Sequence, residues 1–277
     1  MNKSIFLTLL FAICVVCGTN LRAQSYDELI TRSFDCIDAD SLAEAEEALL
    51  QALRLEPANA GNGLVLLNLG TIQRRQGKLS DAASSYSIGL GFLPRNINLL
   101  NSRAQLYAEM ERYAEAIDDY TEVIRQQPQD EDAYYERALC RLMSGDTLGA
   151  RLDLEQIDTF NPQSAKSRLG MAIVYKAKHQ WREASELYDA LIERNPKSAS
   201  LLRDRAEVHY LSGRMGAAFD DANRSIQLNP RDPLSYVLRA QIRYARGDRE
   251  FARRDLNQAL DLGLNRDEVA DLIEKLK

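Results

Sequence analysis

The chain has 277 residues, of which 45% are hydrophobic and 27% charged, so it is long enough for one or two globular domains or for one elongated repeat array. Its formal net charge is −6 at pH 7. A surface of this sign repels nucleic acid and anionic membranes, so neither is expected as a direct partner.

The first 23 residues have the layout of a secretory signal peptide. Lys3 is followed by an apolar run of 13 residues, Ile5 to Cys17, and then by small and polar residues up to Ala23. The run is too short to span a bilayer as a helix, which takes about 20 residues, and neither cysteine in it follows the small residue that lipid attachment requires. We therefore expect export and cleavage after Ala23, which leaves 33 basic and 41 acidic residues and a net charge of −8.

From residue 26 onward the sequence repeats with a period of 34. The clearest mark is a proline in five successive units: Pro94, Pro128, Pro162, Pro196 and Pro230. An alanine lies twelve residues before each of them: Ala82, Ala116, Ala150, Ala184 and Ala218. The units cover 63–96, 97–130, 131–164, 165–198, 199–232 and 233–266, and a divergent first unit covers 26–59.

Each unit is predicted to be a helical hairpin. When every unit is numbered from 1 to 34, position 34 of the five units between 63 and 232 holds Asn, Asp or Ser, which cap the helix that begins at the next residue. Position 15 is glycine in four units, which ends the first helix. Alanine at position 20 lets the two helices approach closely, and proline at position 32 stops the second helix.

This pattern resembles the tetratricopeptide repeat. The small residue at position 8 (for example Ala104), the alanine at 20, the aromatic residue at 24 (Tyr86, Tyr120, Tyr188) and the proline at 32 all match, whereas the tryptophan of position 4 is absent. The resemblance implies an all-α superhelical solenoid of antiparallel helix pairs with about seven repeats. The amphipathic residues 267–277 are expected to form a capping helix over the last repeat.

Positions 7 and 23 change together from repeat to repeat, which predicts an ion pair between the two helices of a hairpin. Four units carry arginine at 7 and aspartate at 23, and two units carry neither. The pairs are Arg103 with Asp119, Arg137 with Asp153, Arg205 with Asp221, and Arg239 with Asp255. Because a half-buried arginine needs its carboxylate, we expect structural ties here, not a binding site.

No catalytic or metal-binding constellation is found in the sequence. His209 occupies a core-facing aromatic position, and His179 has no second histidine near it in sequence. Trp181 is expected to pack between helices. Cys36 and Cys140 are three repeats apart, so both are expected to be reduced and buried, with a mixed disulfide through Cys36 as the minor alternative. We predict neither an enzyme nor a cofactor.

The resemblance places ligands in a concave groove lined by positions 2, 5, 9 and 12 of the first helices. Carried onto this sequence, the groove should hold an apolar middle and a polar rim. The expected residues are Tyr135, Leu139, Leu142, Leu169, Ile173, Lys176, Arg203, Glu207, Tyr210 and Tyr244. The alternative is that the superhelix already buries part of this row. Glu136 replaces an asparagine of the clamp by which some family members hold chaperone tails, which disfavours that ligand.

These observations predict a non-catalytic scaffold or adaptor of a bacterial cell envelope that binds a peptide or helix of a partner protein. Export indicates the periplasm or the cell surface, with only indirect membrane association. The alternative is an envelope-associated or secreted virulence or structural factor that binds host protein or a glycan.

Overall fold

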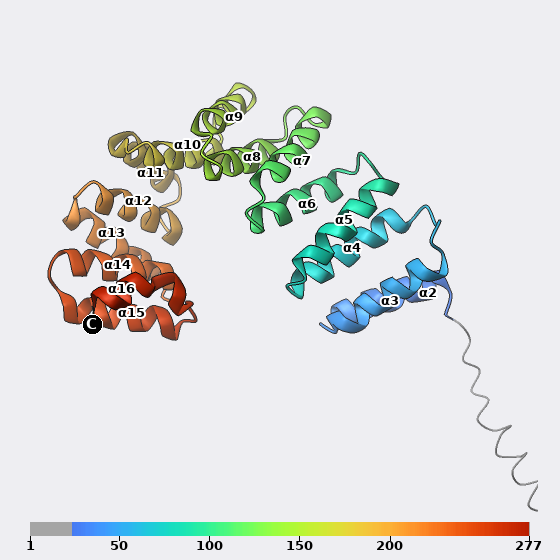
Figure 1. The fold of residues 1–277 in the computed structure, drawn as a ribbon. Coiled ribbons are helices and arrows are strands. Elements are labelled where there is room, and N and C mark those ends of the chain that lie inside the picture. The colour runs from blue at the N-terminus through green and yellow to red at the C-terminus, as the bar shows by residue number, and fades with distance from the viewer. Residues whose placement is uncertain (1–23, 277) are drawn as a thin grey trace, which may run out of the picture. The chain divides into compact units, whose positions relative to one another are not determined.

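The computed structural model describes residues 24–276, which contain helices and turns and no strand (Figure 1). The expected signal peptide lies outside these residues. The helices of the described part, taken in chain order, are α2 Tyr26–Asp38, α3 Leu42–Leu55, α4 Asn62–Arg75, α5 Leu79–Phe92, α6 Ile97–Glu109, α7 Tyr113–Gln126, α8 Glu131–Met143, α9 Thr147–Phe160, α10 Ala165–Ala177, α11 Trp181–Arg194, α12 Ala199–Leu211, α13 Met215–Leu228, α14 Pro233–Ala245, α15 Arg249–Asp261, η1 Arg266–Val269 and α16 Ala270–Lys275.

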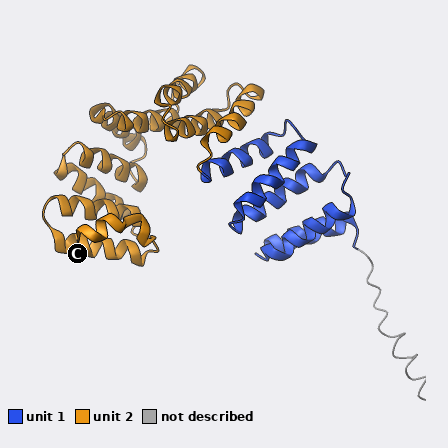
Figure 2. Cartoon of the chain, in the orientation of Figure 1, with its two compact units in different colours: residues 1–110 blue, residues 111–277 orange. Residues whose placement is uncertain are grey.

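The chain divides into two compact units, with the boundary after Met110 (Figure 2). Unit 1 contains α2 to α6, and unit 2 contains α7 to α16. Within each unit the two helices of a hairpin pack on each other, and the second helix also packs on the first helix of the next hairpin. The all-α solenoid expected from the repeat is confirmed. No helix among the described residues is long and apolar enough to cross a membrane.

The helices begin and end where local chemistry requires. The cap residues at position 34 accept hydrogen bonds from backbone N–H groups of the next first helix, as Asp130 does from Ala133 and Ser164 from Ser167. The position-15 glycines have positive φ, for example +77° at Gly77. Glu111 and His179 take the same left-handed conformation in the units that lack glycine, with φ of 58° and 57°, so the turn is kept even where its usual residue is missing.

Small side chains bring the helices of each hairpin together. The position-20 alanines are fully buried. The tyrosines at position 24 follow one turn later on the same helices, with at most 2% of their surface exposed. In the second unit, 63–96, position 8 is Gly70, where a Cβ atom would lie 2.5 Å from the ring of Tyr86. Close approach between helices, and not chain flexibility, therefore explains this glycine.

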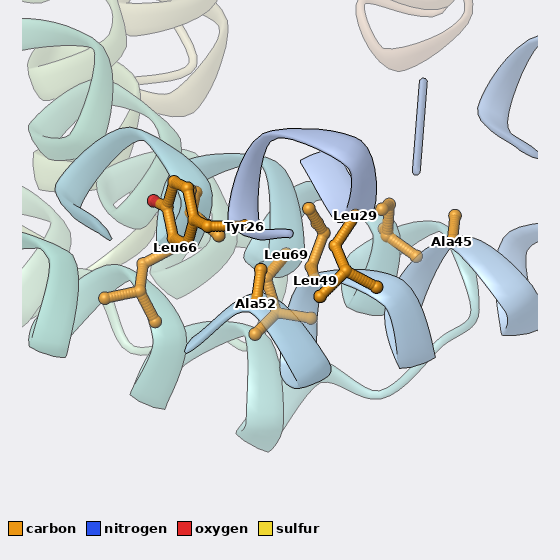
Figure 3. Packing of buried hydrophobic residues seen from close by; sticks show 9 residues of the cluster. Tyr26, Leu29, Ala45, Leu49, Ala52, Leu66 and Leu69 are labelled. Carbon is orange, nitrogen blue, oxygen red and sulfur yellow. The ribbon is translucent and has the colours of Figure 1, made fainter. Parts of the chain in front are cut away.

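The divergent first hairpin is joined to the second through a buried apolar cluster (Figure 3). Tyr26, Leu29 and Leu49 lie in it together with Leu66 and Leu69 of α4. The three additional residues before position 1 of the second unit end at Asn62, whose side chain accepts a 2.9 Å hydrogen bond from the Tyr26 hydroxyl and donates one of 2.8 Å to the carbonyl of Glu56. These hydrogen bonds satisfy the buried amide and fix the insertion.

The C-terminal cap differs in detail from the expected continuous helix. It begins with the short 3-10 helix η1 and continues as α16, whose Leu272 packs on Leu256 of α15 together with Val269. Asn265 caps η1 by accepting from the N–H of Asp267. The cap covers the apolar end of the array, which is the role the sequence predicts for this segment.

Candidate functional site

The ten residues expected in the groove all lie on first helices of unit 2. They come from α8, α10, α12 and α14, and every one of their side chains is partly exposed. We call the surface formed by these ten residues and their neighbours on the same helices the first-helix face.

Part of the expected apolar row contributes to the core. Tyr135 and Leu142 pack against the buried cluster that contains Leu154 and Ile157. Leu169 packs in the same way against the cluster around Tyr188. These side chains serve both the core and the surface, so the freely available apolar area in the middle of unit 2 is smaller than the sequence pattern implies.

Two cavities of the first-helix face lie further along the chain, on α12, α14 and the cap. One, of about 360 Å³, is lined by side chains that include Tyr210, Tyr244 and, from the cap, Leu272. The other, of about 290 Å³, is lined by residues that include Arg203 and Glu207. Both cavities share Val237 and Gln241 of α14. Four of the ten expected residues therefore border a cavity.

The sequence could have identified only some of the other lining residues. Val237 and Gln241 occupy positions 5 and 9 of the last repeat, so the repeat register already places them on this face. Glu268, Asp271 and Lys275 also line the larger cavity, but they come from the cap. No repeat position predicts where side chains of the cap will point, so these residues were missed.

The polar residues of this face are already held in place. Lys176 donates a 2.8 Å hydrogen bond to Glu207, which links α10 to α12. Arg203 contacts Asp204 at 3.1 Å and Asp232 at 3.0 Å, and Asp232 also caps α14. The face is therefore pre-organised, which lowers the entropic cost of binding.

Two carboxyl groups on the same helices lie in partly desolvated surroundings. Burial raises the pKa of Glu136, and among the described residues no hydrogen bond or ion pair to its side chain is found. Burial also raises the pKa of Asp204 in spite of the neighbouring Arg203 guanidinium. The pKa of the Tyr135 phenol is raised by burial first and then by the charges of Glu136 and Asp204. Burial therefore disfavours the charged form of both carboxyl groups.

Three of the four expected arginine–aspartate pairs form bidentate ion pairs. Asp153 accepts from Arg137 at 3.0 and 2.6 Å, and the pairs of Arg205 with Asp221 and of Arg239 with Asp255 have distances between 2.7 and 2.9 Å. The fourth pair, Arg103 with Asp119, has one residue in each unit and stays a prediction.

Each of these arginines also reaches the preceding repeat. The remaining nitrogen, Nη1, donates to the side chain at position 25 of the unit before, sixteen residues earlier in the chain. The acceptors are Thr121 for Arg137, Asp189 for Arg205 and Asn223 for Arg239, and Ser87 accepts from Arg103 within unit 1. The arginines thus join neighbouring hairpins, which supports a structural role.

The other candidate side chains are structural or isolated. His209 is buried with its Nε2 3.7 Å from Asp221, and burial lowers its pKa. The rings of His179 and Trp181 meet edge to face at 4.9 Å. Cys140 is buried, which raises its pKa to about 11, whereas Cys36 is only partly buried, so the expectation that both are buried was wrong for Cys36. Residues 24–276 contain no group of three or more His, Cys, Asp or Glu side chains suited to a metal ion.

Comparison with known proteins agrees with this architecture. The tetratricopeptide repeat family model matches residues 37–96, 101–165 and 169–233. The crystal structure of a tetratricopeptide repeat protein from Parabacteroides merdae ATCC 43184 is 35% identical, with a TM-score of 0.85, and the match covers 92% of this chain and 99% of that one.

Curated relatives are more distant and longer. The Hsp70-Hsp90 organizing protein of Triticum aestivum is 23% identical over 74% of this chain and 42% of its own length. The mitochondrial import receptor subunit TOM70 of Homo sapiens is 22% identical over 91% of this chain and 46% of its own length. This chain therefore spans less than half of these relatives. The repeat units, their helix pairs and the family match together establish that the chain belongs to the tetratricopeptide repeat family.

Proposed function

We propose that this chain is a non-catalytic adaptor that binds a peptide or helix of a partner protein on the first-helix face of unit 2. The observation that carries the proposal is the pair of adjacent cavities on α12, α14 and the cap, which share Val237 and Gln241. Partly exposed tyrosines and fixed charges border them, a combination common in protein interfaces. The names of the relatives, an organizing protein and an import receptor, agree with protein ligands.

We propose further that the protein acts outside the cytoplasm, in the envelope of a bacterium. The layout of residues 1–23 supports export, and the bacterial protein with 35% identity supports a bacterial setting. Expression of the full chain followed by cell fractionation and mass measurement tests this part. Recovery of a shortened protein from the periplasm or the surface is expected, and a full-length protein in the cytoplasm would refute it.

A displayed peptide library selected on the purified chain, residues 24–277, tests the binding proposal. Selected peptides should bind the double variant Tyr210→Ala/Tyr244→Ala at least tenfold more weakly, because both rings line the larger cavity. The matched control is Leu148→Ala/Leu152→Ala on α9, whose side chains are 61% and 52% exposed; its affinity should change less than twofold. Equal effects of the two double variants would refute binding on this face.

A further inference from the structure

A stack of alternating arginine and phenylalanine side chains covers the last two hairpins. The guanidinium of Arg246 lies 4.9 Å from the ring centre of Phe219, and that of Arg243 lies 5.6 Å from the same ring. Arg243 also lies 5.4 Å from the ring of Phe251, which has Arg254 at 5.4 Å. We call these five side chains the arginine–phenylalanine ladder. Four of them lie on α13, α14 and α15, and Arg246 is the residue that follows α14 as its C-cap.

The inner member of the ladder is structural. Arg243 is partly buried, donates a 2.7 Å hydrogen bond to Asp255 and contacts the carbonyl of Phe251 at 3.3 Å. Its pKa is lowered, first by burial, an effect to which the nearby Arg239 adds. Arg243 thus lies between the two rings and is tied by its Nη1 atom to α15.

The outer members are available to solvent. Phe251 is 51% exposed, and Arg246 is exposed and forms no ion pair with any described residue. Arg254 is exposed, and its one ion pair within residues 24–276 is with Glu250, one turn before it on α15; both side chains are more than 60% exposed. Such an exposed pair contributes little to stability, so Arg254 can exchange its partner.

The last repeat carries a net positive charge, as do units 63–96 and 165–198, although the chain as a whole is acidic. Residues 233–266 contain seven arginines and four acidic residues, a net charge of +3, whereas residues 24–277 together carry −8. No other unit places phenylalanine at position 19, as Phe251 is, or arginine at position 14, as Arg246 is. The outer part of the ladder is therefore a local feature of the last repeat and does not follow from the repeat itself.

We propose that the ladder is a second interaction surface, which binds carboxylates of an acidic segment of a protein partner. Guanidinium groups pair with carboxylates through two parallel hydrogen bonds, and a flanking ring that already stacks on the guanidinium keeps the group oriented. A long polyanion does not fit, because within the ladder only the arginines Arg246 and Arg254 are exposed and the net negative charge of the rest of the chain repels it. None of the five ladder side chains lines either cavity of the first-helix face, so this inference stands whether or not that face binds peptides.

Fluorescence anisotropy with a labelled octaglutamate peptide tests this inference on residues 24–277 at low ionic strength. The double variant Arg246→Glu/Arg254→Glu should raise the Kd at least tenfold, and Phe251→Leu, which keeps an apolar side chain without the ring, should raise it about threefold. Arg151→Glu/Arg182→Glu is the matched control, since it makes the same change of charge at exposed arginines that pair with an acid four residues away; a change below threefold is expected.

Three results would overturn the proposal. One is unmeasurable binding of the peptide by the unmodified protein, and another is an equal loss in the two double variants, which would show attraction by net charge alone. The third is tighter binding of heparin, or of vesicles containing phosphatidylglycerol, than of octaglutamate, which would assign the surface to a polysaccharide or a membrane. Circular dichroism spectra and melting temperatures of each variant ensure that a loss of binding is not a loss of fold.

Discussion

In the sixth repeat, the Asp221 carboxylate lies between two basic side chains, Arg205 and His209. Arg205 donates to both of its oxygens, and His209 lies 3.7 Å away at position 11. In the fourth and seventh repeats, position 11 is a second arginine, Arg141 or Arg243, at 2.8 and 2.7 Å from the equivalent aspartate. The second repeat has a neutral version, in which Ser85 donates a 2.7 Å hydrogen bond to Gln73.

The loss of Asp221 should therefore be more harmful than the loss of Ser85. Asp221→Ala leaves a partly buried arginine without its main acceptor, and we expect it to lower the free energy of unfolding by about 3 kcal/mol. Ser85→Ala removes one neutral hydrogen bond and should cost about 1 kcal/mol. Thermal melts of the two variants beside the unmodified chain give the comparison, and equal shifts of melting temperature would contradict the pairing.

His209 should make stability depend on pH. Burial, followed by the charge of Arg214, lowers its pKa in the folded state, so folding favours the neutral imidazole. The stabilisation is complete above the unfolded pKa of about 6.5 and is lost as the pH falls through that value towards the folded pKa. Between pH 7.5 and pH 5.0 the melting temperature of the unmodified chain should fall more than that of the His209→Gln variant. An equal or smaller fall in the unmodified chain would disprove this linkage.

At the scale of elements, the cap of unit 2 is formed by two short helices, η1 and α16. Leu272 is 7% exposed and packs on the end of α15. Truncation by Leu272→Ala should destabilise unit 2 by about 2–4 kcal/mol. Leu228→Ala, at a leucine that is 39% exposed, is the matched control and should cost less than about 0.5 kcal/mol. Similar melting shifts for both variants would mean that the cap is dispensable.

The helices were predictable because their start and stop signals are local. Proline at position 32, a capping side chain at 34 and glycine at 15 act through the backbone of their own turn, whatever lies around them. The left-handed His179 and the 3-10 turn η1 were not predictable, because packing of neighbouring elements overrides the preference of the residue. The hydrogen bonds that fix Asn62 depend on Tyr26, 36 residues away, and no short-range pattern reveals them.

The candidate site was predictable only in part for a similar reason. The repeat register places Arg203, Glu207, Tyr210 and Tyr244 on the face that carries the cavities. The register does not determine how much of the Tyr135 or Leu169 side chain is buried, because burial depends on the side chains packed around each. The contacts made by position 11 could have been predicted from the sequence. The basic residues Arg141, His209 and Arg243 at this position all occur in units that carry the arginine–aspartate pair.

For the molecule as a whole, the arginines at position 7 join three hairpins of unit 2, those of repeats 131–164, 199–232 and 233–266, to the repeat before each. A contact between neighbouring repeats propagates stability along the array, as expected for a solenoid. The first-helix face is therefore carried by a continuous packed body from α8 to the cap, and a bound segment would touch several repeats at once.

Hydrogen–deuterium exchange of residues 24–277, measured with and without a saturating peptide from the library selection, tests binding on the first-helix face most directly. We expect the peptide to slow exchange in α12, α14 and α16, where the two cavities lie, and to leave α13 and α15 within experimental error of the free protein. Protection confined to α13 and α15, with none in α12 or α14, would contradict a partner-binding role for this face.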